Sequence, residues 1–309
     1  MCGIAGIIYR NGASDVGSDM TRMLQSMKHR GPDSTGYALY GPKGAGVLVR
    51  YKLADSNSPR DFDYLDRLGR HQAEVQSRME SLGAKVLFSH AETEYAYRVT
   101  LEYDGDLKRL VDYVEDVPEA EVLSIGHSLE IIKDLGDAES VAGQYDLNLF
   151  TGTHAIGHVR MATESDVDIS GAHPYWAYPF SDVAVVHNGQ LTNYFYWRRR
   201  LERNGHRFQS ECDSEIIAVY LAEQMAEGKS LEDSMRQSLE ELDGVFTYMC
   251  VTADALGVCK DEMAAKPLVL YEGEDMVAMA SEEMAIRAII DHEIETYDPY
   301  ESEVLVWTR

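Results

Sequence analysis

The order of strand-like and helix-like segments is the feature that most limits how this chain can fold. Strand patterns occur near both ends, and residues 52–126 form a separate run ordered helix, strand, strand, helix, strand. After residue 153, short alternating strands are interleaved with helices, which favours antiparallel sheets covered by helices. No flexible linker divides the chain. The pattern therefore predicts an α+β protein, with one domain over residues 1–309 and a small α/β module, 52–126, inserted in it.

The local patterns also predict individual elements. Apolar spacing predicts helices over residues 18–29, 60–82, 105–116 and 282–291. Residues 128–136 and 138–147 are predicted to form two short helical pieces. A buried strand in "VAVVHNGQLTN" is expected to stop at its Asn-Gly dipeptide, because Asn-Gly is common in tight turns.

The charge balance excludes two classes of partner. The chain has 28 basic and 53 acidic residues, a net charge of −25. Nucleic acid and anionic membranes require basic surfaces, so neither is expected as a partner, whereas a protein with a basic face is favoured. No apolar run reaches the roughly 18 residues of a membrane span, and the N-terminus lacks the pattern of a signal peptide. A cytoplasmic location is expected.

The cysteines and histidines are considered next as chemical groups. Cys250 and Cys259 lie in strand-like segments and are expected to be buried free thiols. Cys2 follows Met1, and removal of that methionine would leave a thiol and a free α-amine on one residue, a known catalytic pair. A buried thiol in a first strand is the other interpretation. Three histidines of the motif region have no metal-ligand spacing and are predicted to bind no zinc: His158, His173 and His187.

Five short motifs decide between these interpretations. "MCGIAGI", "HRGPDSTGYALY", "GHVRMAT", "HNGQLTN" and "CDSE" occur in this order. Together they resemble the class II glutamine amidotransferase domain, the type with an N-terminal nucleophile. The resemblance covers both ends of the chain and skips residues 52–126. It implies a four-layer αββα sandwich, in which two antiparallel sheets lie face to face with helices outside.

The resemblance assigns roles to the first and third motifs. Cys2 matches the nucleophile that attacks the side-chain amide of glutamine. Arg160 matches the clamp for the substrate α-carboxylate, a role that suits a planar guanidinium, and a surface ion pair is the alternative. Thr163 matches a hydroxyl donor at the same end. The sequence departs from the common pattern at Glu164, where many members have histidine.

The remaining motifs complete the implied site. Asn188 and Gly189 resemble the oxyanion hole, with a plain tight turn as the alternative. Asp213 resembles the acceptor of the substrate α-ammonium, and a helix N-cap is its alternative role. Arg30 matches a loop that shapes the pocket mouth. The aromatic Trp176 and Tyr178 are candidates for a lid over glutamine, although core packing is the favoured interpretation.

The overall resemblance is to stand-alone amidotransferase subunits of N-methylglutamate synthase or of split, archaeal-type glutamate synthase. It implies a glutaminase-type subunit that binds glutamine and works with partner subunits. FMN and iron–sulfur clusters are expected on those partners, and no cofactor on this chain. Two alternatives stay open at this point: a catalytically silent subunit of such a synthase, and an N-terminal-nucleophile acylase with another substrate.

Overall fold

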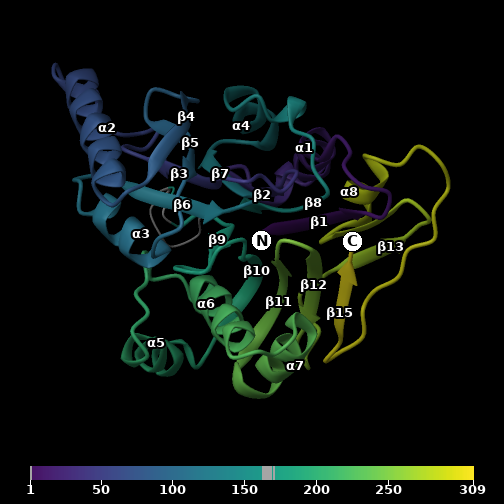
Figure 1. Ribbon diagram of the computed structural model, residues 1–309. Helices are drawn as coiled ribbons and strands as arrows, with labels where there is room; N and C mark the ends of the chain where they lie inside the picture. Colours follow the sequence, from purple (N-terminus) through teal and green to yellow (C-terminus); the bar gives the residue numbers. More distant parts are fainter. Residues whose placement is uncertain (1, 162–168, 170) are drawn as a thin grey trace.

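Two antiparallel sheets form the centre of the protein (Figure 1). The computed structural model describes residues 2–161, 169 and 171–309. The six-stranded sheet has the order β13-β14-β1-β8-β2-β7, and the five-stranded sheet has the order β15-β12-β11-β10-β9. The strands of the first sheet are β1 (Gly3–Tyr9), β2 (Ser34–Tyr40), β7 (Leu129–Leu135), β8 (His154–Arg160), β13 (Val269–Glu272) and β14 (Met276–Ala280). Those of the second are β9 (Tyr175–Trp176), β10 (Ala184–Leu191), β11 (Gly244–Val251), β12 (Ala255–Lys260) and β15 (Val304–Thr308).

The two sheets pack face to face through a shared apolar core. Strands β1 and β8 of one sheet contact β10 and β11 of the other. The approach is close at Gly6, where an added Cβ would lie 3.0 Å from the sulfur of Met249 on β11. Buried residues of both sheets belong to one cluster, which is how sandwiches bury their inner faces.

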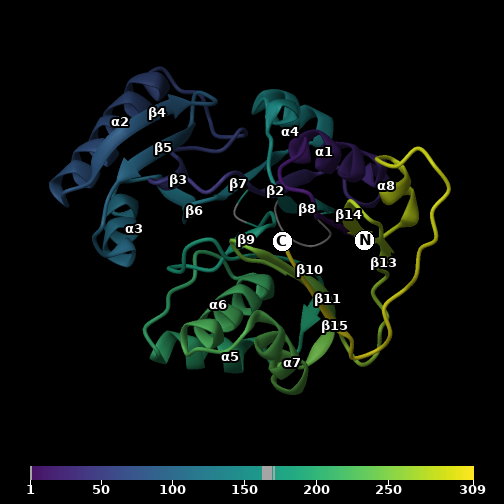
Figure 2. The same cartoon turned by 45° about the vertical axis from the view of Figure 1, so that its right-hand side comes forward.

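Helices cover the outer faces of both sheets (Figures 1 and 2). On the six-stranded sheet lie α1 (Val16–Ser26), α4 (Ala138–Gln144) and α8 (Glu283–Arg287). On the other lie α6 (Asp213–Ala226) and α7 (Leu231–Glu241), with α5 (Tyr194–Arg203) outside α6. Glycines allow this contact: a Cβ at Gly157 would lie 2.6 Å from Leu24 of α1, and one at Gly257 would lie 2.5 Å from Met235 of α7.

A third sheet carries the module predicted between the two halves. Its order is β4-β5-β3-β6, with helices α2 (Tyr64–Ser81) and α3 (Leu107–Glu115) beside it. The strands are β3 (Val47–Lys52), β4 (Lys85–Ala91), β5 (Ala96–Glu102) and β6 (Glu121–Gly126). Strand β3 pairs with both β5 and β6, so this sheet begins before residue 52, where the sequence pattern placed the module.

The structure corrects three local predictions. Residues 128–136 are not helical: β7 pairs along its whole length with β2, and its β-branched Ile131 and Ile132 are buried in the sheet. Strand β10 does not stop at Asn188-Gly189, because both residues pair with β11. The helix predicted over 282–291 is the shorter α8.

Among the described residues, no helix is both long enough and apolar enough to cross a membrane.

Candidate functional site

The motif residues meet in one cavity of about 900 Å³. Five of the seven residues assigned to the site from the sequence line it: Cys2, Arg160, Asn188, Gly189 and Asp213. They come from the start of β1, the end of β8, the strand β10 and the first turn of α6. Gly3 pairs with Val159, so Cys2 and Arg160 lie at the same end of two neighbouring strands. Segments far apart in sequence are therefore brought to one hollow. Thr163, together with Glu164, lies outside the described residues.

Two side chains hold the backbone of Cys2. Its carbonyl accepts hydrogen bonds from Asn188 Nδ2 at 3.2 Å and from Arg30 Nε at 3.1 Å. Arg30 is buried and its guanidinium also pairs with Glu282 at 2.6 Å. Arg30 is not among the residues that line the cavity, so the structure places it behind Cys2 rather than at a pocket mouth. Its position there fixes the residue that carries the thiol.

Asn188 and Gly189 lie on an extended strand rather than in a turn. They pair with Thr247 and Phe246 of β11. Gly189 has φ of +152°, and a Cβ there would lie 2.1 Å from the carbonyl oxygen of Val245. Only glycine fits this close approach of two strands. The Asn188 side chain is buried and directed toward Cys2, so its amide N–H groups and the thiol belong to the same cavity.

Asp213 begins helix α6 and lines the same cavity. It is the first helical residue, and Cys212 holds the N-cap position, so the predicted cap role is wrong. Its Oδ2 accepts the backbone N–H of Leu191 at 2.7 Å, and its Oδ1 lies 3.6 Å from Nδ1 of His187. Burial alone would raise the pKa of this carboxyl, but the interactions with His187 and Leu191 outweigh burial and lower it. Asp213 is therefore an anion that faces the cavity.

Three buried histidines form another part of the wall. The rings of His158 and His173 stack with centroids 4.2 Å apart. The hydroxyl oxygen of Ser214 lies 3.1 Å from Nε2 of His173 and 2.8 Å from Nδ1 of His187. Burial, with the nearby charges of His187 and Arg160, lowers the pKa of His158 to about 3, so its ring is neutral. Within the described part of the chain, no three ligand-type side chains are placed to hold a metal ion.

Neither ring nitrogen of His158 contacts a polar atom of the described residues, and the same holds for Nε2 of His187. Both residues line the cavity. A buried polar nitrogen without a partner is unfavourable, by about 1–3 kcal/mol. A polar molecule in the cavity would supply the missing hydrogen bonds. The wall therefore suits a ligand rich in donors and acceptors.

Several lining residues lie outside the five motifs and were not predicted from the sequence. Arg198, Phe208 and Gln209 come from α5 and the segment after it, and Lys266 comes from the segment after β12. Lys266 is positioned by its backbone, whose carbonyl accepts the hydroxyl of Thr247 at 3.3 Å. No local pattern in "AAKPL" marks this lysine, because only the sheet pairing brings it near Cys2.

The aromatic pair predicted as either lid or core belongs to the core. Trp176 and Tyr178 are buried members of the main apolar cluster and do not line the cavity. The Trp176 indole N–H donates to the carbonyl of Phe180 at 2.5 Å. The Tyr178 hydroxyl donates to Asp112 of the inserted module, so this ring also ties the module to the main body.

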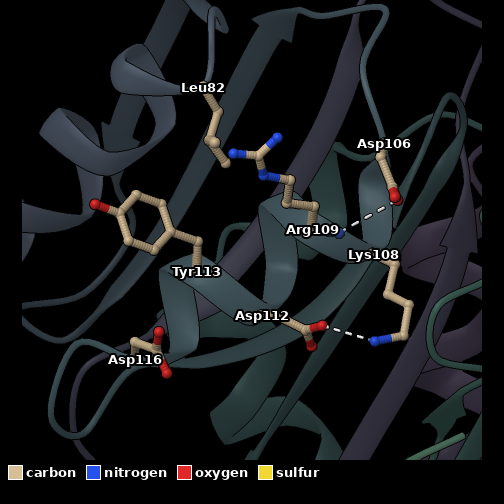
Figure 3. A pocket seen from close by; sticks show the side chains of 7 residues that line it. All are labelled: Leu82, Asp106, Lys108, Arg109, Asp112, Tyr113 and Asp116. Atoms are coloured by element: carbon tan, nitrogen blue, oxygen red, sulfur yellow. Dashed lines mark hydrogen bonds and ion pairs between the residues drawn. The ribbon is translucent and has the colours of Figure 1, made fainter. Parts of the chain in front are cut away.

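A second hollow, of about 340 Å³, lies along α3 on the inserted module (Figure 3). Two of its carboxylates already have partners: Lys108 pairs with Asp112 at 2.8 Å, and Asp106 accepts the backbone N–H of Arg109 at 3.2 Å (Figure 3). It contains no cysteine, histidine or amide side chain. The cavity at Cys2 is therefore the candidate active site.

Comparisons with known proteins agree with this geometry. A family model described as a glutamine amidotransferase domain matches residues 158–288. A protein of Methanothermobacter thermautotrophicus with a provisional glutamine amidotransferase name is 40% identical over 98% of this chain and 99% of its own length. The glutamine amidotransferase-like protein GlxB of Rhizobium meliloti is 33% identical over 99% of this chain and 98% of its own length.

Among solved structures, the glutamine phosphoribosylpyrophosphate amidotransferase of B. subtilis matches with a TM-score of 0.62. The sequence identity is 18%, and the match covers 99% of this chain but 47% of that chain, so it shows the shared fold alone. The fold and the cavity thus define an amidotransferase of the N-terminal-nucleophile type. The chain belongs to the class II glutamine amidotransferases.

Proposed function

We propose that this chain hydrolyses the side-chain amide of glutamine through a thioester on Cys2, as the amidotransferase subunit of a larger synthase. The observation that carries the proposal is the meeting of Cys2, Arg160, Asn188, Gly189 and Asp213 in one cavity. A zwitterionic amino acid needs a cation for its carboxylate and an anion for its ammonium. Arg160 and Asp213 supply this pair, with Cys2 in the same hollow.

The reaction begins with the α-amine of Cys2, which is free once Met1 has been removed. This amine, with an ordinary pKa near 8, takes the thiol proton directly or through one water. The thiolate adds to the amide carbon, and negative charge develops on the amide oxygen. The Asn188 side-chain N–H and the backbone N–H at Gly189 stabilise this oxyanion.

The intermediate then collapses and the C–N bond breaks. The protonated amine of Cys2 gives its proton to the leaving nitrogen, and ammonia departs. A γ-glutamyl thioester remains on Cys2. Water, activated by the same amine, attacks the thioester and releases glutamate, which restores the thiol. Arg30 takes part only by holding the Cys2 carbonyl, through its hydrogen bond at 3.1 Å.

The alternatives make different predictions about substrate choice. We expect the wild type to hydrolyse glutamine at least 100-fold more efficiently, in kcat/KM, than 4-aminobutanamide, which lacks the α-carboxylate. Replacing Arg160 with alanine should remove most of this preference, because a hydrogen bond to a charged group contributes about 1.5–3 kcal/mol. The matched control is Arg198→Ala, which removes another cavity arginine, one that bonds to Ser210 and pairs with Glu202. This control should keep the preference.

Each rival gives a distinct result in that assay of ammonia release. A silent subunit would hydrolyse neither amide. An acylase of other specificity would hydrolyse both at similar rates, with or without Arg160. If Arg198→Ala abolished the preference for glutamine and Arg160→Ala left it intact, Arg198 rather than Arg160 would bind the α-carboxylate, and the proposed role of Arg160 would be wrong.

Membership of a synthase is the finer part of the proposal. It rests on the resemblance of the motifs to stand-alone amidotransferase subunits of such synthases. We propose that the partner subunits carry FMN and iron–sulfur clusters and form either N-methylglutamate from methylamine or glutamate from 2-oxoglutarate.

An affinity-tagged chain, isolated from the cells in which it occurs, should therefore co-purify with flavin-containing subunits. With 2-oxoglutarate as acceptor and a two-electron donor that reduces the partner flavin, the amide ¹⁵N of glutamine should enter the amino group of newly formed glutamate. With methylamine as acceptor, the label should instead leave as ammonia while N-methylglutamate forms. Isolation of the chain without flavin, and with neither product formed, would contradict this part of the proposal while leaving glutamine hydrolysis intact.

A further inference from the structure

Helix α5 lies at the periphery of the protein (Figures 1 and 2). Its exposed residues are basic and aromatic, although the chain as a whole is acidic. It is anchored on one side only, by Trp197 and Leu201, which are buried and one helical turn apart. The Trp197 ring packs edge-on against Tyr220 of α6 at 4.9 Å, and its N–H donates to the carbonyl of Glu241 at 3.0 Å. The opposite side of α5 faces solvent.

The exposed residues of α5 follow helical spacing. Tyr196, Arg199, Arg200 and Arg203 stand at positions i, i+3, i+4 and i+7, which places them on one face of the helix. Together they line a shallow hollow of about 420 Å³. Phe195 lies beside this stripe and is 70% exposed, while Tyr196 is 58% exposed. We call these four lining residues the α5 stripe.

The charges of the α5 stripe are unusual for this chain. Within the described residues, none of its three arginines forms an ion pair with a carboxylate, although acidic residues outnumber basic ones by 53 to 28. Arg198, on the same helix but outside the stripe, pairs with Glu202 at 3.1 Å. The stripe is thus a local concentration of uncompensated positive charge.

Helix stability explains only part of this pattern. Arg200 and Arg203 lie in the last turn, where cations favour the helix dipole by roughly 0.3–1 kcal/mol. That effect does not require Arg199, which lies earlier in the helix. It also does not require two large aromatic side chains in solvent beside the arginines.

Two of the arginines are held in place before any partner binds. The Arg200 guanidinium lies over the Trp197 ring, 4.7 Å from its centroid. Arg199 Nε donates to the carbonyl of Phe195 at 2.9 Å. Restricting a side chain in advance lowers the entropy lost on binding. Planar guanidinium groups suit carboxylates, and tyrosine, phenylalanine and arginine are enriched at the centres of protein interfaces.

We propose that the α5 stripe is a docking surface for a carboxylate-rich segment of a partner protein. Nucleic acid is disfavoured because it carries charge along its whole length and would extend past the stripe onto the surface of a chain with a net charge of −25. At physiological salt, charges beyond about 8 Å are screened, so a short acidic segment is attracted by the stripe alone. The stripe does not line the Cys2 cavity, and the inference does not rest on the proposed function.

The test uses a fluorescent oligoglutamate peptide and measures its binding by anisotropy at physiological salt. The triple variant Arg199→Glu, Arg200→Glu, Arg203→Glu should bind at least ten-fold more weakly than the wild type. The matched control is Arg22→Glu, Arg70→Glu, Arg236→Glu. It reverses three arginines on other helices that are also exposed, with side-chain exposures of 53%, 65% and 55%. The control should bind within two-fold of the wild type.

Further measurements make each result decisive. Circular dichroism establishes that both triples fold, and Arg→Gln at the three stripe positions replaces the Glu variant if that variant does not. Equal weakening in both triples would attribute binding to net charge and overturn the proposal, as would an absence of peptide binding to the wild type. Analytical sedimentation tests whether a second copy of the chain binds the stripe. Vesicles that contain phosphatidylglycerol, and separately inorganic phosphate, test whether other anions bind it. The proposal would also be overturned if the triple variant of the stripe lost self-association or binding of these other anions while its affinity for the peptide stayed unchanged.

Discussion

Replacing Cys2 with alanine should reduce glutamine hydrolysis by about 10⁴-fold or more, the usual scale when a catalytic nucleophile is removed. The side chain lies in the cavity with Arg160, Asn188 and Asp213, and no other group there can form the thioester while using its own terminal amine as the base. Binding of glutamine should change little, because Arg160 and Asp213 are untouched. The rate is measured by release of glutamate, and binding by calorimetry.

The cavity provides a matched control for this experiment. Cys212 also lines the hollow, with its sulfur 3.4 Å from the hydroxyl oxygen of Ser214. Burial, together with the charge of Asp213, raises the pKa of the Cys212 thiol, so it stays protonated and unreactive. Cys212→Ala should therefore retain activity within a few-fold. If activity were lost in Cys212→Ala and kept in Cys2→Ala, Cys212 rather than Cys2 would be the nucleophile, and the assignment of Cys2 would be wrong.

The second large effect is expected at Asn188. Asn188→Ala should lower kcat by about 10²–10³-fold, the usual effect of losing one oxyanion-hole donor, while KM for glutamine changes little. The control is Gln190→Ala, which removes an exposed amide from the same strand and the same cavity. It should have near-normal kcat.

Asn188 also donates to the Cys2 carbonyl at 3.2 Å, so its removal could act by displacing the nucleophile. The rate at which iodoacetamide alkylates Cys2 separates the two effects. We expect this rate to stay within about three-fold of the wild type, since thiol reactivity depends on the thiolate and its access. An alkylation rate that falls in parallel with kcat would show that Asn188 positions Cys2 and would contradict its oxyanion role.

The sequence motifs predicted the site better than the local structure around it. Cys2, Arg160, Asn188, Gly189 and Asp213 were selected as short patterns, and the packing of the two sheets and of helix α6 brings all of them to one cavity. The prediction that the strand stops at Asn188-Gly189 was wrong because it used only the local preference of this dipeptide for turns. In the fold, pairing with β11 holds both residues extended, and the lack of a Cβ at Gly189 serves a close strand contact instead.

Other features could not be predicted because they depend on distant partners. Residues 128–136 were predicted to be helical, yet β2 pairs with residues 129–135 along their whole length and makes them a strand. The local sequence around Arg30 does not show whether its side chain lines the cavity or lies behind Cys2. Its role follows from Glu282, which lies 252 residues away in sequence and fixes its guanidinium. Lys266 enters the cavity for similar reasons of long-range packing.

The most direct test of the account is the mass of the N-terminal peptide during turnover. Protein mixed with glutamine is quenched in acid, which preserves thioesters, and its peptides are measured by mass spectrometry. The account predicts that the first peptide begins at Cys2, without Met1, and that a fraction carries one γ-glutamyl group on Cys2. A first peptide that retains Met1, or a glutamyl group on another residue while glutamate accumulates, would contradict it.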